Sequence, residues 1–522
     1  MPQEPNNFYV TSPIYYVNDI PHIGHAYTSI ACDIAARFNR LSNNKTFFLT
    51  GTDEHGQKVE KSANKKDKNP QEFCDEVSEK FKELTNILQL SNDDFIRTTE
   101  SRHKTFAQQF WQKLEKNGYI YKGVYEGWYA IRDEAFYAED EIVDGKAPSG
   151  AEVEWQKQES YFFKLSAFED KLLTLFEAAP DFIQPKSRYN EVVSFVKGGL
   201  KDLSISRNTF SWGVKVPGDE KHVMYVWLDA LTNYLSALDA ENNSSNYQDF
   251  WHDTKNAPLH IVGKDIVRFH AVYWPAFLMA AEENLPYQVY AHGWWTNNGE
   301  KISKSLGNTI NPVTELEWLK ELGCDDNQAL DYFRYFLFRE VPFGNDGDYS
   351  RESFFNRVNS ELANNIGNLT QRTLSMIQKN NDGKIVSYQD YSDGQCLLKD
   401  AYDLKENYQN LMTDLAFDKA MFAVLTHSSK CNEFINDKKP WNLKKEGKID
   451  EMNQVLSLLA ENIRIIAVCL QPFCINLAPQ MLNLLNVEGK DFSTLTKEHC
   501  LKESHKINEP KALFPRLTPL AA

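Results

Sequence analysis

The pattern of apolar and polar positions near the start of the chain predicts a strand, a helix and a second strand. Residues 8–11 form a short run of β-favouring side chains, and a stretch rich in turn-forming residues follows it. In residues 25–41 the apolar side chains recur every three or four positions, as on one face of a helix. Residues 46–50 are typical of a buried strand. This β-α-β order is the first half of a doubly wound nucleotide-binding fold.

The pattern changes twice further along the chain. Residues 120–200 are rich in Tyr, Trp, Phe and Gly with short β-like runs, which indicates an inserted α+β module. Strand candidates at residues 224–227, 259–262 and 288–291 mark the return of the α/β pattern. After about residue 350 the apolar spacing is helical to the end. We therefore predict an α/β protein, a Rossmann-type parallel sheet split by an inserted module and followed by an all-α domain.

Composition narrows the class of protein. The chain has 522 residues, enough for three to four domains of roughly 150 residues each. Its 42% hydrophobic and 25% charged residues are typical of soluble globular proteins. The longest apolar runs, such as residues 465–470, are far shorter than the ~18 residues of a membrane span, and residues 1–10 lack a signal-peptide pattern. We expect neither a secreted nor a membrane protein.

Charge and cysteine content exclude further classes. The net charge of −16 argues against a generic nucleic-acid coat protein, although a local basic patch can still bind RNA. The eight cysteines are scattered and none forms a CxxC pair, so neither a zinc ribbon nor a disulfide framework is visible. We interpret them as free thiols of a reducing cytosol.

Two short motifs carry candidate phosphate chemistry. His22, Gly24 and His25 lie between the first strand and the first helix, where ligands of doubly wound folds bind and where helix amides attract anions. Lys301 and Lys304 lie with the hydroxyls of Ser303 and Ser305 in a loop that could hold a polyphosphate. Each motif alone has an ordinary alternative: surface histidines at a helix start for the first, a solvated basic loop for the second.

These motifs occur with three others in a fixed order. The chain contains PIYYVNDIPHIGHAY, FLTGTDEHGQKV, YVWLDALTNYL, IVGKDIVRFH and KISKSLGN. Together they closely resemble the methionyl-tRNA synthetases, a family of class I aminoacyl-tRNA synthetases, from about residue 8 to beyond residue 441. The resemblance implies that L-methionine is activated with ATP to methionyl-adenylate and transferred to the 3′ end of tRNA(Met), for initiation and elongation of translation.

The resemblance also implies domain boundaries. Residues 1–117 and 223–298 are the two halves of the Rossmann catalytic domain, and residues 118–222 are the inserted connective module. Residues 299–350 hold the KISKS loop and a stem-contact region. Residues 351–522 form the α-helical anticodon-binding domain.

The resemblance assigns a methionine pocket. Asp53 matches the family's aspartate for the substrate ammonium group, and Arg207 matches an arginine close to the substrate. The pocket itself corresponds to Pro13, Ile14, Tyr16, Trp227, Ala230, Leu231, Tyr234, Ile266 and His270. An apolar aromatic box suits a polarizable thioether. Two alternatives remain open: a metal site at Asp53, Glu54 and His55, which consecutive residues cannot easily form, and a plain core stripe at residues 227–234.

The resemblance assigns ATP to the two phosphate motifs and to a loop at residues 263–265. The ATP-binding residues would be His22, Gly24, His25, Gly263, Asp265 and Lys304, and the catalytic ones His22, His25, Lys301 and Lys304. Asp265 would accept hydrogen bonds from the ribose, or else cap the following helix. We expect Mg²⁺ to accompany ATP. Ile302 replaces the methionine usual in this loop, and we expect it to pack inward.

The helical domain carries a candidate anticodon reader. Asn368 and Arg372 are four residues apart and so share a helix face, and Trp441 is placed to stack on an unpaired base. The surrounding residues 436–448 contain five lysines, a local reversal of the overall acidity. The alternative for Pro440 and Trp441 is a proline-started helix with a packing tryptophan.

Three further expectations follow from the resemblance. The inserted module has no cysteine, so we expect the zinc-free form of the family with no metal site. No appended dimerisation domain follows the helical region, so we expect a monomer, and we expect a cytoplasmic location. The rival interpretation is a non-catalytic tRNA-binding protein that retains the fold, which the intact His22, His25, Asp53 and Lys304 disfavour.

Overall fold

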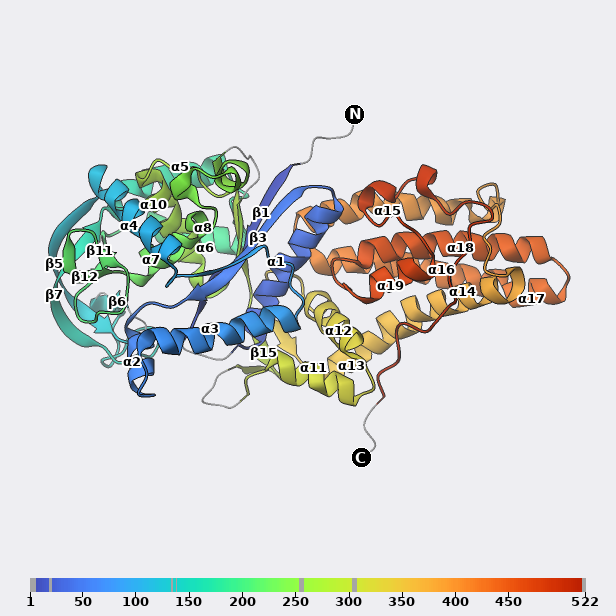
Figure 1. Cartoon of the computed structure of the whole chain (residues 1–522), viewed down its shortest axis with the longest axis horizontal. Coiled ribbons are helices and arrows are strands. Elements are labelled where there is room, and N and C mark those ends of the chain that lie inside the picture. The colour runs from blue at the N-terminus through green and yellow to red at the C-terminus, as the bar shows by residue number, and fades with distance from the viewer. Residues whose placement is uncertain are drawn as a thin grey trace.

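The centre of the molecule is a parallel sheet with a helical bundle to one side of it (Figure 1). The computed structural model describes residues 6–17, 21–132, 135–137, 139–252, 258–302 and 308–518. The seven-stranded sheet has the order β2-β3-β1-β13-β14-β8, with β4 also paired to β3. Its strands are β1 (Asn7–Thr11), β2 (Tyr15–Tyr16), β3 (Lys45–Asp53), β4 (Asp94–Arg97), β8 (Ile183–Gln184), β13 (Leu259–Gly263) and β14 (Gln288–His292).

The strand order reverses on either side of β1. This strand pairs in parallel with β3 on one edge and with β13 on the other, although β13 comes about 250 residues later. The first helix, α1 (Ile23–Leu41), connects β1 and β3 and buries most of its side chains. The predicted β-α-β unit and Rossmann-type sheet are thereby confirmed. The reversal creates a switch point beyond the carboxyl ends of β1 and β13, where doubly wound folds bind ligands.

The inserted residues form a second, antiparallel sheet of order β6-β5-β7-β9. A long ladder joins β5 (Ile120–Ala130) to β7 (Glu154–Phe163), flanked by β6 (Ala135–Tyr137) and β9 (Leu203–Ser204). Between β7 and β9, and so within the predicted insert, strand β8 pairs with β14 and belongs to the large sheet. Helices α5 (Glu169–Ala178) and α6 (Lys186–Lys197) flank β8 in sequence.

One predicted strand is wrong. Residues 224–227 do not form a strand of the large sheet, because β12 (Asp219–Met224) ends at Met224 and a helix, α7 (Val226–Leu231), begins two residues later. A short apolar run of this kind has no periodicity that separates a strand from a buried helix. The strands predicted at 259–262 and 288–291 are confirmed as β13 and β14.

The α-helices predicted after about residue 350 are confirmed up to residue 484, and the helical region begins earlier than predicted, at residue 312. Its helices include α11 (Pro312–Glu321), α12 (Asp326–Arg339), α13 (Arg351–Arg357), α14 (Asn368–Asn381), α15 (Gln395–Thr413), α16 (Phe417–Lys438), α17 (Pro440–Lys445), α18 (Ile449–Leu470) and α19 (Leu477–Leu484). By length and composition α18 could cross a membrane, but 94% of its apolar window is buried in the bundle. A helix that is apolar all round is the expected core of such a bundle.

A continuous apolar core joins the sheet to the bundle. Ile30 and Ile34 of α1 belong to the same buried cluster as Phe336 of α12 and Leu459 of α18. Ile302 packs against this cluster, as expected from its apolar character. All eight cysteines are free thiols. The catalytic-type sheet and the helical bundle are therefore packed together rather than joined by an open linker.

Candidate active site

A cavity of about 740 Å³ opens at the switch point of the sheet. Its walls come from the segment after β1, the start of α1, the end of β3, helix α7 and the chain after β13. It contains all ten residues predicted for methionine: Pro13, Ile14, Tyr16, Asp53, Trp227, Ala230, Leu231, Tyr234, Ile266 and His270. It also contains five of the residues predicted for ATP: His22, Gly24, His25, Gly263 and Asp265. Segments up to 250 residues apart thus share one cavity.

The two histidines of the first motif form the N-terminal cap of α1. Nδ1 of His22 accepts a hydrogen bond from the Gly24 amide at 3.1 Å, and Nδ1 of His25 accepts one from the His22 amide at 3.1 Å. Because Nδ1 is the acceptor in both rings, the proton of each neutral imidazole lies on Nε2. Each ring therefore offers an N–H donor beside the amides of a helix start, an arrangement suited to phosphate oxygens.

Gly24 has a steric role in this cap. A Cβ added at this position would lie 3.0 Å from the His22 ring, closer than a side chain tolerates without displacing the imidazole. The two imidazole rings lie against each other, with centroids 3.9 Å apart. The glycine between the histidines therefore keeps the first ring in its capping position.

The last residue of β3 and the two residues after it point to three different surroundings. Asp53 lines the cavity. Glu54 turns into the interior, where it accepts hydrogen bonds from Arg97 at 2.7 and 2.9 Å and from the Thr99 hydroxyl at 2.6 Å. His55 contacts Asp229 instead. They do not converge, and among the described residues there is no group of three or more His, Cys, Asp or Glu that could hold a metal.

Buried histidines support helix α7 from behind. Asp229 receives His55 Nδ1 at 2.6 Å on one oxygen and His103 Nε2 at 2.8 Å on the other. Burial alone would raise the pKa of Asp229, but the two imidazoles hold this pKa well below its usual range. The buried carboxylate therefore ties α7, which presents Trp227, Ala230 and Leu231 to the cavity, to the end of β3 and to α4 (Ser101–Lys116).

The apolar end of the cavity contains neutral polar groups. Nδ1 of His270 donates to the Ile266 carbonyl at 3.1 Å, so its Nε2 accepts from the Tyr234 hydroxyl at 2.7 Å. Burial lowers the pKa of His270 to about 4, which keeps the ring uncharged at neutral pH. The Trp227 ring stacks on Phe269 with centroids 3.7 Å apart. An uncharged aromatic box of this kind fits an apolar thioether side chain.

The opposite end of the cavity is built around Asp265. Its Oδ1 accepts a hydrogen bond from Nε1 of Trp294 at 3.1 Å, and it does not cap the short helix that starts at Lys264. A Cβ at Gly263 would lie 2.5 Å from this oxygen, so a larger residue there would displace the carboxylate from its present position. The neighbouring Lys264 pairs with Asp346 at 2.6 Å. Asp265 therefore lies in the cavity as a hydrogen-bond acceptor.

Three other predicted residues lie elsewhere or outside the described part of the chain. The backbone of Lys301 belongs to β16 (Glu300–Lys301), while Lys304 lies outside the described residues. Arg207 is buried beside Tyr225 and donates to Ser204 and Ser206. It is not among the residues that line the cavity. The sequence around Arg207 did not predict this packing role.

The cavity also contains residues that sequence reasoning missed. Among them are Thr28, Lys58, Arg132, Ser149, Asn233, Phe269, His292 and Trp294. Thr28 could have been found, because it lies one helical turn after His25 on the same face of α1. Arg132 and Ser149 come from the inserted module, and only the folded structure brings them to the cavity.

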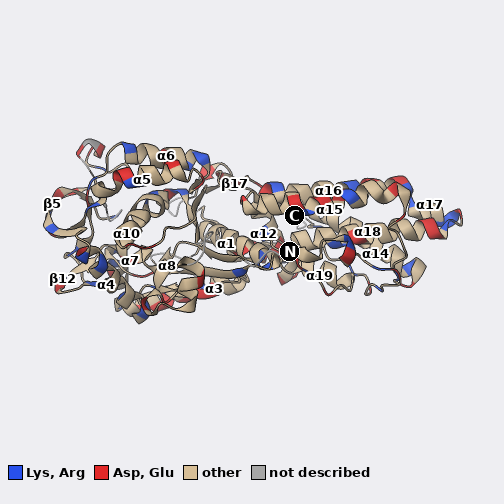
Figure 2. Cartoon of the chain, turned by 90° about the horizontal axis from the view of Figure 1, so that it is seen from above, with Lys and Arg blue, Asp and Glu red and all other residues tan. Residues whose placement is uncertain are grey.

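The predicted anticodon residues lie in the helical bundle. Asn368 begins α14 and is exposed, and Arg372 follows one turn later. The guanidinium carbon of Arg372 lies 5.1 Å from the centre of the Trp441 ring, which is 36% exposed. Trp441 is in the proline-started helix α17, which lies at the far end of the bundle (Figure 2). The bundle thus presents an aromatic ring, a guanidinium and several lysines on one tip.

The fold and the cavity define a class I aminoacyl-tRNA synthetase architecture, and comparison with known proteins agrees. A model described as tRNA synthetases class I (M) matches residues 8–153 and 146–374, and one described as the anticodon binding domain of methionyl tRNA ligase matches residues 389–520. The chain is 54% identical to the methionine–tRNA ligase of Rickettsia felis, with 98% of both chains covered, and 47% identical to that of Brucella suis, also with 98% of both covered.

A solved structure gives the same result. The methionyl-tRNA synthetase of Mycobacterium tuberculosis in complex with methionyl-adenylate superposes with a TM-score of 0.92 at 42% identity, over 98% of this chain and 100% of that one. This chain belongs to the methionyl-tRNA synthetase family.

Proposed function

We infer that this chain is a methionine–tRNA ligase, which joins L-methionine to tRNA(Met) at the expense of ATP. The observation that carries this inference is the cavity at the switch point, which brings the residues expected for methionine and most of those expected for ATP within 740 Å³. The family membership and the adenylate-bound relative support it. Initiation and elongation of translation would both use the product.

In the first step, a carboxylate oxygen of methionine attacks the α-phosphorus of ATP. The bond from that phosphorus to the bridging oxygen breaks, and pyrophosphate leaves with the electron pair. We propose that Asp53 holds the methionine ammonium group and that the neutral box around His270 holds the thioether. No side chain needs to form a covalent bond, since positioning and charge stabilisation suffice.

Two groups of side chains are proposed to bind the phosphates of ATP. The Nε2–H groups of His22 and His25 are proposed to donate to phosphate oxygens as charge develops. Lys301 and Lys304 are proposed to stabilise the departing pyrophosphate, and Asp265 to accept from the ribose hydroxyls. In the second step the terminal adenosine hydroxyl of the tRNA attacks the activated carbonyl and AMP leaves.

Mg²⁺ is proposed to arrive bound to the phosphates of ATP. Its phosphate ligands would come from the substrate, which agrees with the lack of a three-ligand group among the described side chains. Bound there, it would neutralise phosphate charge. We also propose a zinc-free, cytoplasmic enzyme that acts as a monomer. Light scattering of the purified protein tests the monomer, and subcellular fractionation tests the location.

The experiment that tests the function is exchange of labelled pyrophosphate into ATP, run separately with each amino acid. Magnesium and a zinc chelator are present throughout. Exchange with methionine alone supports both the activation chemistry and the zinc-free assignment. Exchange with a different amino acid contradicts the methionine pocket, and no exchange from folded protein favours a tRNA-binding protein without catalysis.

A further inference from the structure

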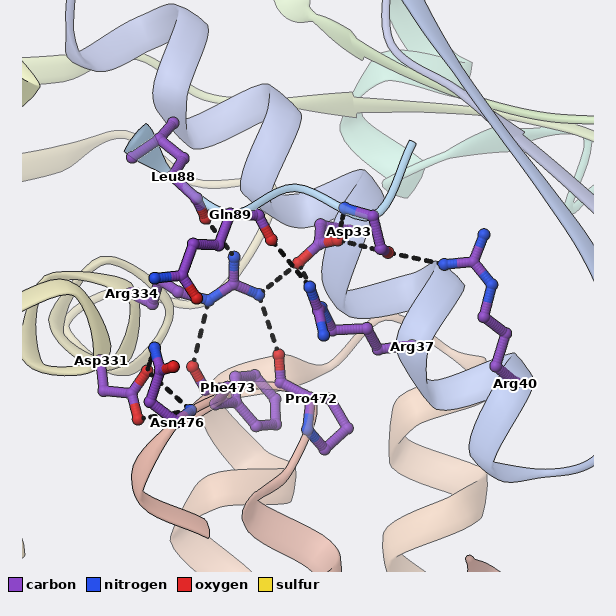
Figure 3. Close-up of polar contacts among 11 residues, drawn as sticks. Asp33, Arg37, Arg40, Leu88, Gln89, Asp331, Arg334, Pro472, Phe473 and Asn476 are labelled. Carbon is purple, nitrogen blue, oxygen red and sulfur yellow. Dashed lines mark hydrogen bonds and ion pairs between the residues drawn. The ribbon is translucent and has the colours of Figure 1, made fainter. Parts of the chain in front are cut away.

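A buried arginine connects the first helix of the catalytic sheet to the helical bundle (Figure 3). Arg334 of α12 and Asp33 of α1 form an ion pair at 2.6 Å, and both side chains are completely buried. The same guanidinium donates to the carbonyls of Pro472 at 3.1 Å and Phe473 at 3.2 Å, which lie just after α18. A fourth, longer contact of 3.4 Å reaches the Leu88 carbonyl, directly after α3 (Pro70–Ile87).

Asp331 holds the other end of the same turn. It lies three residues before Arg334 on α12 and accepts hydrogen bonds from the backbone amides of Asn476 at 3.0 Å and Leu477 at 2.6 Å. These amides belong to the start of α19. Arg334 and Asp331 therefore hydrogen-bond to residues 472–477 at both ends of this segment. We call Asp33, Asp331 and Arg334 the interdomain clamp.

The carboxylate oxygens of Asp33 also accept hydrogen bonds from residues next to the catalytic sheet. Its Oδ1 accepts from the amide and the hydroxyl of Ser91 at 2.7 and 2.6 Å, and its Oδ2 accepts from Arg37 at 2.7 Å. The pKa of Asp33 would be raised by its burial, but Arg334 and Arg37 lower it below the usual value. The clamp is thus a fully paired buried site rather than a stray ion pair.

Two helices lead from the clamp to the two predicted substrate regions. Asp33 lies eight residues beyond His25 on α1, so the clamp is about 12 Å along that helix from the cavity. The turn at 472–477 ends α18, whose 22 residues span about 33 Å at 1.5 Å per residue. The opposite end of α18 meets α17, which carries Trp441 (Figure 1). The clamp therefore lies between the cavity and the anticodon tip.

We propose that Arg334 is a positioning residue that holds the helical bundle at a fixed orientation to α1, so that a tRNA bound by its anticodon presents its 3′ end at the cavity. This proposal rests on the proposed function. A tRNA is a fairly rigid molecule held at two distant points, so the effective concentration of its 3′ end in the cavity depends on their spacing. Misplacement of reacting groups by 1 Å can slow a reaction by about 10²-fold.

The choice of arginine supports positioning over simple stabilisation. A buried ion pair is weak evidence for stability, because apolar side chains of similar volume often stabilise as well or better. Arg334 instead uses its planar fork to contact three separate segments of chain, which specifies their relative orientation. Lysine keeps the charge but not this fork.

The test is a paired replacement in the full-length enzyme. Asp33→Asn with Arg334→Met removes both charges together, so no charge is left buried alone. The matched control is Glu461→Gln with Arg464→Met, which removes an equally buried ion pair of α18 whose other partners, Tyr402, Thr494 and Leu501, also lie in the helical bundle. If the first double variant does not fold, Arg334→Lys replaces it. Three quantities are measured: adenylate formation from methionine and ATP, the Kd for tRNA(Met), and the single-turnover transfer rate from preformed adenylate.

We expect the clamp variant to form adenylate at the wild-type rate and to bind tRNA(Met) with a Kd within about twofold of wild type, while its transfer rate falls at least about tenfold. The control should keep the wild-type transfer rate. Equal transfer rates in the clamp variant and the wild type contradict the proposal, as does an equal loss in all three measurements. Failure of the wild-type enzyme to form adenylate contradicts the proposed function instead, so the two failures are distinguishable.

Discussion

The start and the middle of helix α1 hold polar side chains in opposite ways. At its start, the imidazoles of His22 and His25 use Nδ1 to cap the helix and line the ligand cavity. In its middle, Asp33 is completely buried and every charge around it is paired within the chain. Polar side chains thus have two uses in α1. The histidines at its start are arranged for an incoming ligand, and Asp33 in its middle fixes one part of the protein against another.

The charge states differ in the same way. Burial lowers the pKa values of His260, His270 and His292 around the cavity, so these rings stay neutral. At the clamp, opposite charges outweigh burial and lower the pKa of Asp33, so it stays ionised. A substitution at the cavity should therefore change reaction rates and substrate affinities, whereas one at the clamp should change how the two parts cooperate.

The largest expected effect concerns His22. Replacement by serine keeps an N-cap for α1 but removes the imidazole N–H, so we expect adenylate formation to slow by about 10²–10³-fold with little change in stability. Replacement by alanine should slow the reaction equally and also lower the free energy of unfolding by about 1 kcal/mol. Pyrophosphate exchange and urea denaturation measure the two effects. An unchanged exchange rate in His22→Ser assigns the residue to capping alone.

The next effect concerns Asp53. Asparagine removes the negative charge at nearly constant volume, so we expect the KM for methionine to rise by roughly 10²-fold, as when one partner of a buried charge pair is lost. The KM for ATP should stay within about twofold and serves as the internal control. A parallel rise in both values would show that Asp53 shapes the whole cavity rather than binding the ammonium group.

A smaller effect is expected at the distant end of the bundle. Trp441→Ala removes a stacking surface, and base–aromatic stacking contributes about 1–3 kcal/mol, so the Kd for tRNA(Met) should rise by roughly 5- to 150-fold. Adenylate formation should not change. Phe422→Ala, at an aromatic ring of the same domain that is 59% exposed, is the matched control. Equal loss in charging and activation would indicate a packing role for Trp441.

The smallest expected effect is a pH dependence that distinguishes the cavity from the clamp. The pKa of His270 is about 4 in the folded protein and 6.5 as the ordinary value, so the unfolded chain binds more protons between these pH values. Stability therefore falls as pH drops through this window, by about 2 kcal/mol between pH 7 and pH 5 from this residue. The lowered pKa of Asp33 affects stability only below its ordinary value of 3.8.

Urea denaturation of wild type and His270→Gln at pH 7 and pH 5 measures this difference. Glutamine stays neutral at both pH values, so the variant should lose about 2 kcal/mol less than wild type on acidification. An identical loss in both proteins would contradict a neutral His270.

Local sequence was enough to predict much of this architecture. The first β-α-β unit and the helices after residue 350 follow from apolar spacing, and the five-residue strands β13 and β14 were predicted from short apolar runs. The strand predicted at 224–227 failed because α7 is only six residues long and buried, which hides the period. The ordered motifs located most of the cavity walls, but not Arg132 and Ser149, which reach the cavity only through the fold of the inserted module.

The clamp could not be predicted from the sequence at all. Asp33 and Arg334 are about 300 residues apart, and each occupies an unremarkable position on an amphipathic helix. Nothing local marks the carbonyls of Pro472 and Phe473 as acceptors. Contacts between domains depend on the relative orientation of whole elements, which residue spacing within one helix does not encode.

The divergence of Asp53, Glu54 and His55 makes the length of this segment more critical than any single side chain in it. A deletion or insertion of one residue at the end of β3 would shift these three positions. The Asp53 carboxylate would then face Arg97, or the His55 imidazole would take its place in the cavity. Three surroundings would change at once: the ligand cavity, the buried arginine pair and the support of α7. A single substitution here changes one of these surroundings, whereas a shift in register changes all three.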